Sequence, residues 1–157
     1  MTDRDKDKAR TTTVATYDLS SHAAYLVRRT HQRATMLFLE IMQDDTITPT
    51  QFAALGTLLE RGPLSQNHLG RLTAMDPSTI SVVVRKLLKR GLVHRFSSPT
   101  DQRLLMIELT PEGRDYTIGR VPLSQKVSEE LLSPLSPGEV ALLKELLGRV
   151  AEASSDS

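Results

Sequence analysis

The chain contains no cysteine, which excludes disulfides, thiolate metal ligands and any thiol-based redox sensor or nucleophile. Long apolar runs are also missing, because charged residues interrupt every apolar stretch within a few positions. No membrane span is therefore expected. The first ten residues contain no apolar segment of the kind found in a secretory signal. These absences predict a cytoplasmic protein.

The sequence also lacks the patterns that enzymes and metal sites usually leave. Its histidines, His22, His31, His68 and His94, are scattered and none stands at the spacing of metal ligands. No Gly-rich phosphate loop and no nucleophile with a base and an orienting group can be found. We therefore expect no enzyme, no metal and no cofactor.

Acidic residues are scarce in the middle of the chain. Residues 61–103 hold eight basic and two acidic residues, a balance of +6 in a chain whose total is +1. The basic residues are Arg61, Arg71, Arg85, Lys86, Lys89, Arg90, Arg95 and Arg103. A local basic stripe in a nearly neutral chain favours a phosphate-binding surface. The alternative is a solvated surface that happens to be basic.

Apolar periodicity divides the chain into helices and one hairpin. A 3.6-residue period predicts a long helix over 19–42, and capping residues followed by proline predict helix starts at Thr48, Asp76 and Thr110. Ser65 is expected to cap a short helix, and Ser136 opens the last one with a capping box. Pro122 should kink or interrupt the helix that begins at Thr110.

The period changes to two at residues 92–96 and 104–109, which predicts two strands joined by a loop. Three helices followed by a hairpin are typical of the winged helix-turn-helix. The expected fold is mainly α with a small β-hairpin, a winged helix-turn-helix flanked by N- and C-terminal dimerisation helices. The ranges are a disordered tail at 1–16, a long helix for dimerisation and pocket wall at 17–45, the DNA-binding domain at 46–110, dimerisation helices at 111–153 and a disordered tail at 154–157.

Spacing also predicts which side chains are buried. The expected buried positions are Phe52, Ala53, Leu55, Leu58 and Leu59 in the helix from Thr48, Leu69 and Leu72 in the short helix, and Ile80, Val83, Val84, Leu87 and Leu88 in the helix from Asp76. Gly91 should end that helix. The last helix is apolar on more than one face, which favours burial against a second subunit.

The helix from Asp76 is the candidate recognition helix, because its outward face starts with short hydroxyls and a valine and ends in basic residues. Short side chains can approach base edges and thymine methyls, whereas Lys89 and Arg90 suit the DNA backbone. Its N-terminal amides could also bind a phosphate. The alternative for Ser78 and Thr79 is ordinary capping chemistry beside Pro77.

The segment 97–113, SSPTDQRLLMIELTPEG, carries a recognisable pattern. Asp101-Gln102-Arg103, followed by Leu109-Thr110-Pro111-Glu112-Gly113, resembles the hallmark of the MarR family of bacterial transcriptional regulators. The segment LSQNHLGRLTAMDPSTISVVVRKLLKRGLV (64–93) is similar to the family's helix-turn-helix in layout. The resemblance implies a homodimer on a pseudo-palindromic operator, with Arg103 in the minor groove. It also implies that Asp101 braces the wing by pairing with a basic side chain. The residues expected at the DNA are Ser65, Gln66, Asn67, Ser78, Thr79, Ser81, Val82, Arg85, Lys86, Lys89 and Arg103.

The resemblance further implies release from DNA by a small aromatic, anionic effector. The stretch YLVRRTHQR (25–33) resembles regulators of aromatic-acid breakdown, including repressors of nicotinate catabolism. An arginine fork beside an aromatic or imidazole donor suits an aromatic carboxylate. The candidate effector residues are His22, Tyr25, Arg28, Arg29, His31 and His68. The alternatives are a solvated helix face, a constitutive regulator, or a winged-helix module for protein contacts without a small-molecule ligand.

Overall fold

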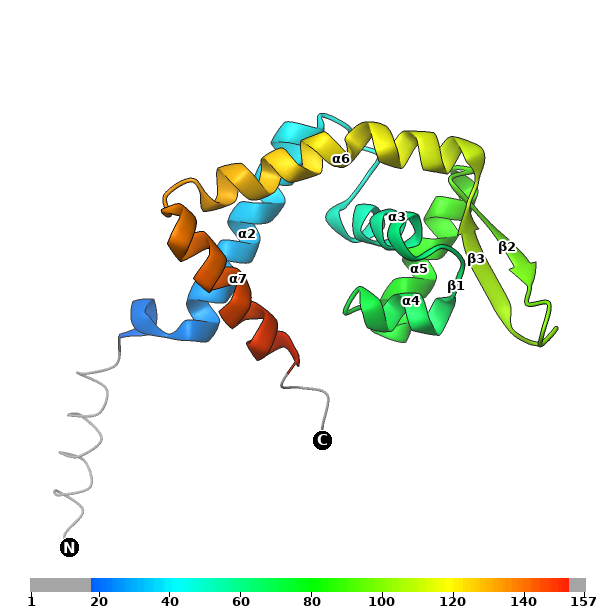
Figure 1. Ribbon diagram of the computed structural model, residues 1–157, viewed down its shortest axis with the longest axis horizontal. Helices are drawn as coiled ribbons and strands as arrows, with labels where there is room; N and C mark the ends of the chain where they lie inside the picture. The colour runs from blue at the N-terminus through cyan, green and yellow to red at the C-terminus, as the bar shows by residue number, and fades with distance from the viewer. Residues whose placement is uncertain (1–17, 153–157) are drawn as a thin grey trace, which may run out of the picture. The chain divides into compact units, whose positions relative to one another are not determined.

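The structure, a computed structural model, describes residues 18–152 (Figure 1). The described chain divides between Ala34 and Thr35 into two units. The expected tails at 1–16 and 154–157 lie outside the described residues, as does residue 153 at the end of the expected last helix.

The first unit contains a short 3-10 helix and the beginning of a long helix. Asp18 accepts a hydrogen bond from the Ser20 amide at 3.0 Å and so caps η1 (Leu19–Ser21). Helix α2 (Ala23–Met42) follows, and its last turns, from Thr35 onward, belong to the second unit. The predicted helix over 19–42 is therefore observed with a 3-10 start.

The second unit holds the remaining elements in the predicted order. They are α3 (Pro49–Arg61), β1 (Leu64–Ser65), α4 (Gln66–Leu72), α5 (Pro77–Lys89), β2 (Val93–Ser97), β3 (Leu105–Leu109), α6 (Pro111–Leu132) and α7 (Pro137–Glu152). The predicted N-caps form, and at α3 the Thr48 hydroxyl and the Gln51 side chain make a complete capping box. Gly91 follows the C-cap of α5 with φ +70°, as predicted.

The sheet has three strands rather than the two of a hairpin. Strands β2 and β3 pair antiparallel with Arg95 opposite Ile107, and β1 pairs on the other edge of β3, giving the order β1-β3-β2. The sequence did not predict β1, because two residues are too few to show a period of two. This strand joins the start of α4 to the wing.

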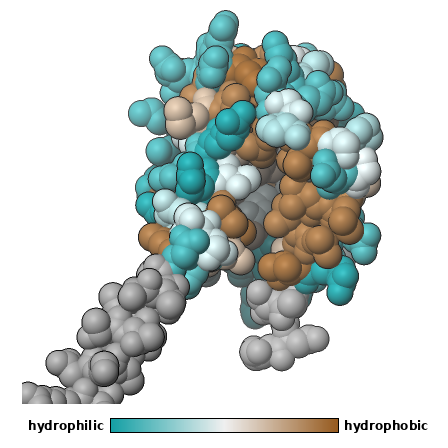
Figure 2. Space-filling model, turned by 90° about the vertical axis from the view of Figure 1, so that its left-hand side faces the viewer, coloured by the Kyte–Doolittle hydropathy of each residue, from teal (hydrophilic) through white to brown (hydrophobic). Residues whose placement is uncertain are grey.

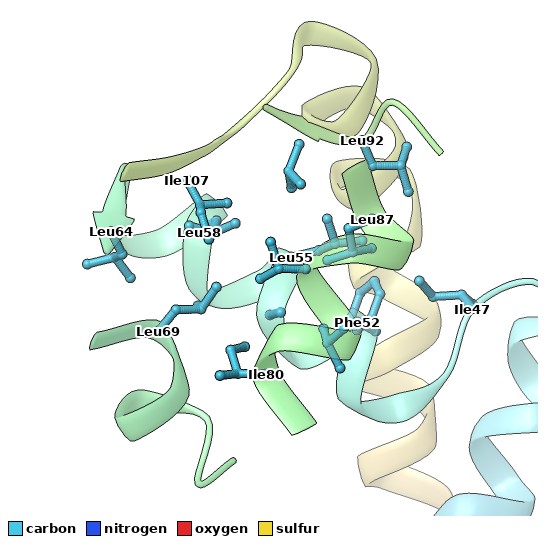
Figure 3. Packing of buried hydrophobic residues seen from close by; sticks show 14 of the residues in the cluster. Ile47, Phe52, Leu55, Leu58, Leu64, Leu69, Ile80, Leu87, Leu92 and Ile107 are labelled. Atoms are coloured by element: carbon cyan, nitrogen blue, oxygen red, sulfur yellow. The ribbon is translucent and has the colours of Figure 1, made fainter. Parts of the chain in front are cut away.

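The core of the second unit lies between α3, α4, α5 and the sheet. Figure 3 shows Leu55, Leu58, Leu69, Ile80, Leu87 and Ile107 pointing toward one another from these elements. Leu55, Leu69 and Leu87 are completely buried. The predicted buried face of α5 is therefore confirmed at four of its five positions, and Leu88 is only partly buried.

Three residues that were predicted to be buried are not fully buried. Ala53 is exposed and Ala54 is buried instead, while Leu59 is only partly buried. Leu72 is 46% exposed, because α4 ends there and turns away from the core. Of the kink or interruption expected at Pro122, the interruption is not observed, since α6 runs unbroken from Pro111 to Leu132, and the kink stays a prediction. Ile118, whose carbonyl loses its helical partner, is itself exposed and can be hydrated.

Candidate nucleic-acid interface

Helix α5 presents a polar and basic face on the side away from the core. Ser78, Val82, Arg85, Lys86 and Lys89 are exposed, and Thr79 and Ser81 are half-buried. The opposite face of α5 carries the buried apolar residues described above. The helical period of α5 therefore separates the side chains that face the core from those that face the surface. The predicted outward face of the recognition helix is thus observed.

The N-terminus of α5 is closed by its own cap. Asp76 accepts hydrogen bonds from the Thr79 amide at 2.9 Å, the Ser78 hydroxyl at 2.6 Å and the Thr79 hydroxyl at 2.7 Å. These bonds, first those of the Ser78 and Thr79 hydroxyls, hold the pKa of Asp76 well below its usual range. The capping interpretation of both hydroxyls is correct. Asp76 takes up the Thr79 amide, and the binding of a phosphate at the remaining N-terminal amides of α5 stays a prediction.

Two grooves run along α5. One, of about 330 Å³, lies between the start of α3 and α5 and is lined by Thr48, Thr50, Gln51, Ser78, Thr79, Val82, Val83 and Lys86. The other, of about 300 Å³, lies between α5 and the sheet and is lined by Gln66, Ser81, Arg95, Leu105 and Ile107. The exposed face of α5 is therefore a ridge between two depressions, a shape that can enter a groove of DNA.

The start of α4 lies beside the second of these grooves. Ser65 caps α4 by accepting from the His68 amide at 3.3 Å, and Asn67 is exposed. Gln66 accepts a hydrogen bond from Arg95 Nη2 at 3.2 Å, across 29 residues of sequence. The sequence analysis had placed Gln66 at the DNA and Arg95 in the basic stripe, but it did not predict a contact between them. Only the fold brings this guanidinium, on β2, next to the helix-turn-helix.

The wing loop contains the two charges of the Asp-x-Arg pattern. Asp101 Oδ1 accepts from the Arg103 amide at 2.9 Å, and the Asp101 carbonyl accepts from the Leu104 amide at 2.9 Å. No ion pair of Asp101 is found in the part of the chain that the structure describes. Asp101 therefore braces the turn through backbone amides, and the expected pairing with a basic side chain is wrong. Arg103 itself is exposed at the tip.

A polar cluster beside α6 escaped the sequence analysis entirely. Tyr116 donates its hydroxyl hydrogen to Asp44 Oδ2 at 2.6 Å, and Arg120 Nη2 donates to the same oxygen at 3.0 Å. Arg90 also belongs to it, since its Nη1 donates to the Thr46 carbonyl at 2.9 Å. The expectation that Arg90 contacts the DNA backbone is therefore wrong for this conformation.

The candidate effector residues fall in different units. His22, Tyr25, Arg28, Arg29 and His31 lie in the first unit, where the Arg29 guanidinium stands 5.9 Å from the centre of the Tyr25 ring. His68 lies on α4 in the second unit and is exposed. The structure thus brings Tyr25 and Arg29 together, and a site shared with His68 stays a prediction.

Helix α7 leaves its apolar side chains uncovered. None of its residues is buried in the single chain. Leu142, Leu146, Leu147 and Val150 are 53%, 42%, 47% and 70% exposed. Figure 2 shows broad brown, apolar areas on the face of the molecule that it presents. A patch of this kind usually marks an interface with another molecule.

No helix within residues 18–152 is long and apolar enough to cross a lipid bilayer. Across the same residues, no three histidine or carboxylate side chains gather where they could hold a metal ion.

Comparison with known proteins shows which family and which proteins the chain is similar to. A sequence profile described as "MarR family" matches residues 47–105. The chain is 31% identical, over 90% of its length and 89% of the relative's, to the HTH-type transcriptional repressor NicR of Pseudomonas putida.

Two solved structures are similar in fold and sequence. BpsR of Bordetella bronchiseptica, whose DNA binding is regulated by 6-hydroxynicotinic acid, is 29% identical with a TM-score of 0.82, over 86% of this chain and 96% of its own. A mutant MarR of Escherichia coli in complex with operator DNA is 25% identical with a TM-score of 0.76, over 85% and 99% of the two chains.

Proposed function

The chain belongs to the MarR family, and from this premise we propose that it is a homodimeric repressor released from a pseudo-palindromic operator by a small aromatic acid. Its broader role is that of a DNA-binding transcriptional regulator, as in its relatives, which are regulators and not enzymes. Its proposed place of action is the cytoplasm, where the operator lies.

The observation that carries the DNA-binding proposal is the exposed face of α5. With the Ser78 and Thr79 hydroxyls engaged by Asp76, the side chains free to read bases are Ser81, Val82 and Arg85. A valine can contact a thymine methyl, and an arginine can donate two hydrogen bonds to guanine. Lys86 and Lys89 suit the phosphates on either side of the major groove.

The wing and α4 complete the proposed interface. Arg103 is exposed on a turn that Asp101 holds through two backbone contacts, so it can enter the narrow minor groove beside α5. The exposure of Asn67 at the start of α4 supports a contact with the DNA backbone, together with Ser65 and Gln66. Ser78 and Thr79 would reach the DNA only by giving up hydrogen bonds to Asp76.

The uncovered face of α7 supports the homodimer. Four large apolar side chains that are exposed in the single chain would be buried by a second copy. A two-fold dimer presents two recognition helices, and its operator is then a pseudo-palindrome with half-sites about one helical turn apart.

The effector proposal rests on the first unit and on the relatives. Tyr25 and Arg29 stand close together on α2, with Arg28, His22 and His31 on the same short stretch. Guanidinium groups bind carboxylates in a bidentate manner, and an aromatic ring can stack on the ligand. Since BpsR responds to 6-hydroxynicotinic acid, we propose a pyridine or benzene carboxylate as the effector, with His68 as a further candidate contact.

Selection of bound fragments from genomic DNA, followed by mobility shifts at two salt concentrations, tests the DNA-binding function. Binding should survive non-specific competitor DNA and weaken as salt rises, because phosphate contacts release counterions. Arg85→Ala should relax the preference for one base, whereas Lys89→Ala should weaken all sequences alike. If neither variant changes operator affinity, the basic face is incidental and a module for protein contacts is the better description.

A thermal-shift panel of benzene and pyridine carboxylates tests the effector. A ligand that binds only the folded protein raises the melting temperature as its concentration rises. We expect a hit to be lost in Arg29→Ala and to lower operator affinity in the wild type. A protein that binds its operator but responds to no member of the panel would be a constitutive regulator.

A further inference from the structure

The polar cluster beside α6 has Asp44 at its centre. Oδ1 of Asp44 accepts from the amide of Thr46 at 3.0 Å and from its hydroxyl, and Oδ2 accepts from the Tyr116 hydroxyl and from Arg120 Nη2. A carboxylate offers about four acceptor sites, so all of them are used. The Asp44 side chain is only 14% exposed. A half-buried carboxylate with every acceptor site filled has one well-defined position.

Two guanidinium groups lie against the Tyr116 ring. The guanidinium carbon of Arg120 stands 3.7 Å from the ring centre, and that of Arg90 stands 5.0 Å from it. Stacking of this kind is attractive and depends on geometry. Arg120 Nε is buried without an acceptor among the described residues, so the stacking and the bond to Asp44 hold this side chain. We call Asp44, Arg90, Tyr116 and Arg120 the junction cluster.

The junction cluster joins three segments that are far apart in sequence. Asp44 and Thr46 lie in the connection between α2 and α3, Arg90 is the C-cap of α5, and Tyr116 and Arg120 lie on successive turns of α6. The recognition helix, the connection and the long helix that leads to α7 are thus tied at one place.

The ionisation states of Asp44 and Tyr116 strengthen the hydrogen bond between them. Although burial raises the pKa of Asp44, the bonds from Thr46 and Tyr116 and the charge of Arg120 hold it well below its usual range. Burial first, and then the bond to Asp44, raises the pKa of Tyr116. Near neutral pH the carboxylate therefore stays ionised and the phenol stays protonated, which keeps the hydrogen bond charge-assisted.

The anchoring of α6 by apolar side chains is slight in comparison. The fully buried residues of α6 are Gly113 and Thr117, neither of which has a large apolar side chain, and Leu123 and Val127 are only partly buried. Apolar contacts tolerate small shifts, whereas hydrogen bonds and stacked charges depend on direction. The polar contacts of the junction cluster therefore restrict the direction of α6 more than these apolar contacts do.

We propose that the junction cluster fixes the direction in which α6 leaves the DNA-binding unit, and so sets the distance between the two half-sites that the dimer recognises. The proposal rests on the proposed function, since it needs a dimer whose α6 and α7 helices carry the two recognition helices. Its members are positioning residues, because they act through α5 and α6 and need not touch DNA.

The test measures affinity for a set of operators that differ only in the distance between half-sites. Adding or removing one base pair turns one half-site by about 34° relative to the other. Wild type should therefore bind one spacing best and lose affinity at both neighbours. Asp44→Asn removes the charge, and Tyr116→Phe removes one hydrogen bond but keeps the ring against which the guanidinium groups lie. In both variants the preference for the best spacing should fall threefold or more.

Two controls separate positioning from general stability. Thr117→Val removes a buried hydroxyl that donates to the Gly113 carbonyl at 2.6 Å, on the same helix but outside the junction cluster. It should lower the melting temperature and leave the spacing preference unchanged. Discrimination against a substituted base within a half-site should be the same in all variants, because no base contact is altered.

The outcomes are distinct. If folded, dimeric variants of Asp44 and Tyr116 lose affinity equally at every spacing, or if Thr117→Val flattens the preference as much, the inference is overturned and the cluster serves stability alone. If wild type binds no operator specifically, the proposed function fails first and the inference falls with it. If Asp44→Asn does not fold, Tyr116→Phe alone decides, since it removes a single hydroxyl.

Discussion

Gly113 closes the Leu-Thr-x-x-Gly pattern, and its replacement by alanine should be far more damaging than a glycine-to-alanine change in a helix usually is. A Cβ built on Gly113 would stand 1.8 Å from the Leu92 carbonyl oxygen and 2.7 Å from its carbon, both backbone atoms. Real Cβ atoms essentially never come closer than 3.0 Å to such atoms, so α6 and the segment before β2 must move apart by about 1.2 Å. The sequence needs glycine here because backbone must approach backbone.

The expected loss in the free energy of unfolding follows from the contacts that this movement breaks. The same Leu92 oxygen accepts from the Thr110 amide at 3.1 Å, and a shift of this size takes that bond out of range. Overpacking typically costs about 1–3 kcal/mol, the lost hydrogen bond about 1 kcal/mol, and the better helix propensity of alanine returns about 1 kcal/mol. We expect Gly113→Ala to lower the free energy of unfolding by about 1–3 kcal/mol, a substantial part of the ~5–15 kcal/mol typical of a domain.

Urea unfolding followed by circular dichroism measures this, at one protein concentration because a dimer's stability depends on it. Gly119→Ala is the matched control on the same helix, since no atom lies within 4 Å of its added Cβ. That variant should be more stable than wild type by about 0.5–1 kcal/mol. A Gly113→Ala protein as stable as wild type would refute the close approach of α6 to Leu92.

Three further predictions concern the wing, the α7 surface and acid stability. Arg103→Ala should weaken operator binding roughly tenfold and reduce the slope of log affinity against log salt by about one; an unchanged slope in mobility shifts at several salt concentrations would place Arg103 away from the DNA. Leu142→Glu combined with Leu146→Glu should give monomers in sedimentation, whereas Lys144→Glu on the same helix should not; dimers in both would move the interface elsewhere. Asp44 has a lower pKa folded than unfolded, so its contribution to stability is present above about pH 4 and is lost as the pH falls through the folded value. The gap in unfolding free energy between wild type and Asp44→Asn should therefore narrow from about pH 7 to about pH 3, and a constant gap would contradict that assignment.

The elements and their ends could be predicted because their signals are local. Thr48, Asp76, Thr110 and Ser136 each bond to a residue two or three positions away, so a short stretch of sequence contains both partners. The buried face of α5 follows from spacing in the same way. The Asp-x-Arg and Leu-Thr-x-x-Gly patterns then indicated the family that the comparisons support.

The errors came from interactions that local patterns do not encode. Leu72 continues the apolar period of a short helix, yet it is exposed where α4 ends. Asp101 was expected to need a basic side chain, but a tight turn supplied backbone amides first. Arg90 was one of several basic residues in a run, and nothing in the run separates the one that bonds to the Thr46 carbonyl from those that face solvent.

The sequence by itself determined the order of helices and strands, the capped polar face of α5 and the position of Arg103 in the wing, because each depends on residues within a few turns of one another. Only the tertiary structure decided that Gln66 meets Arg95, 29 residues away, and that Asp44 meets Tyr116 and Arg120, 72 and 76 residues away. Contacts at such separations depend on how helices pack, and packing is decided by the whole core at once.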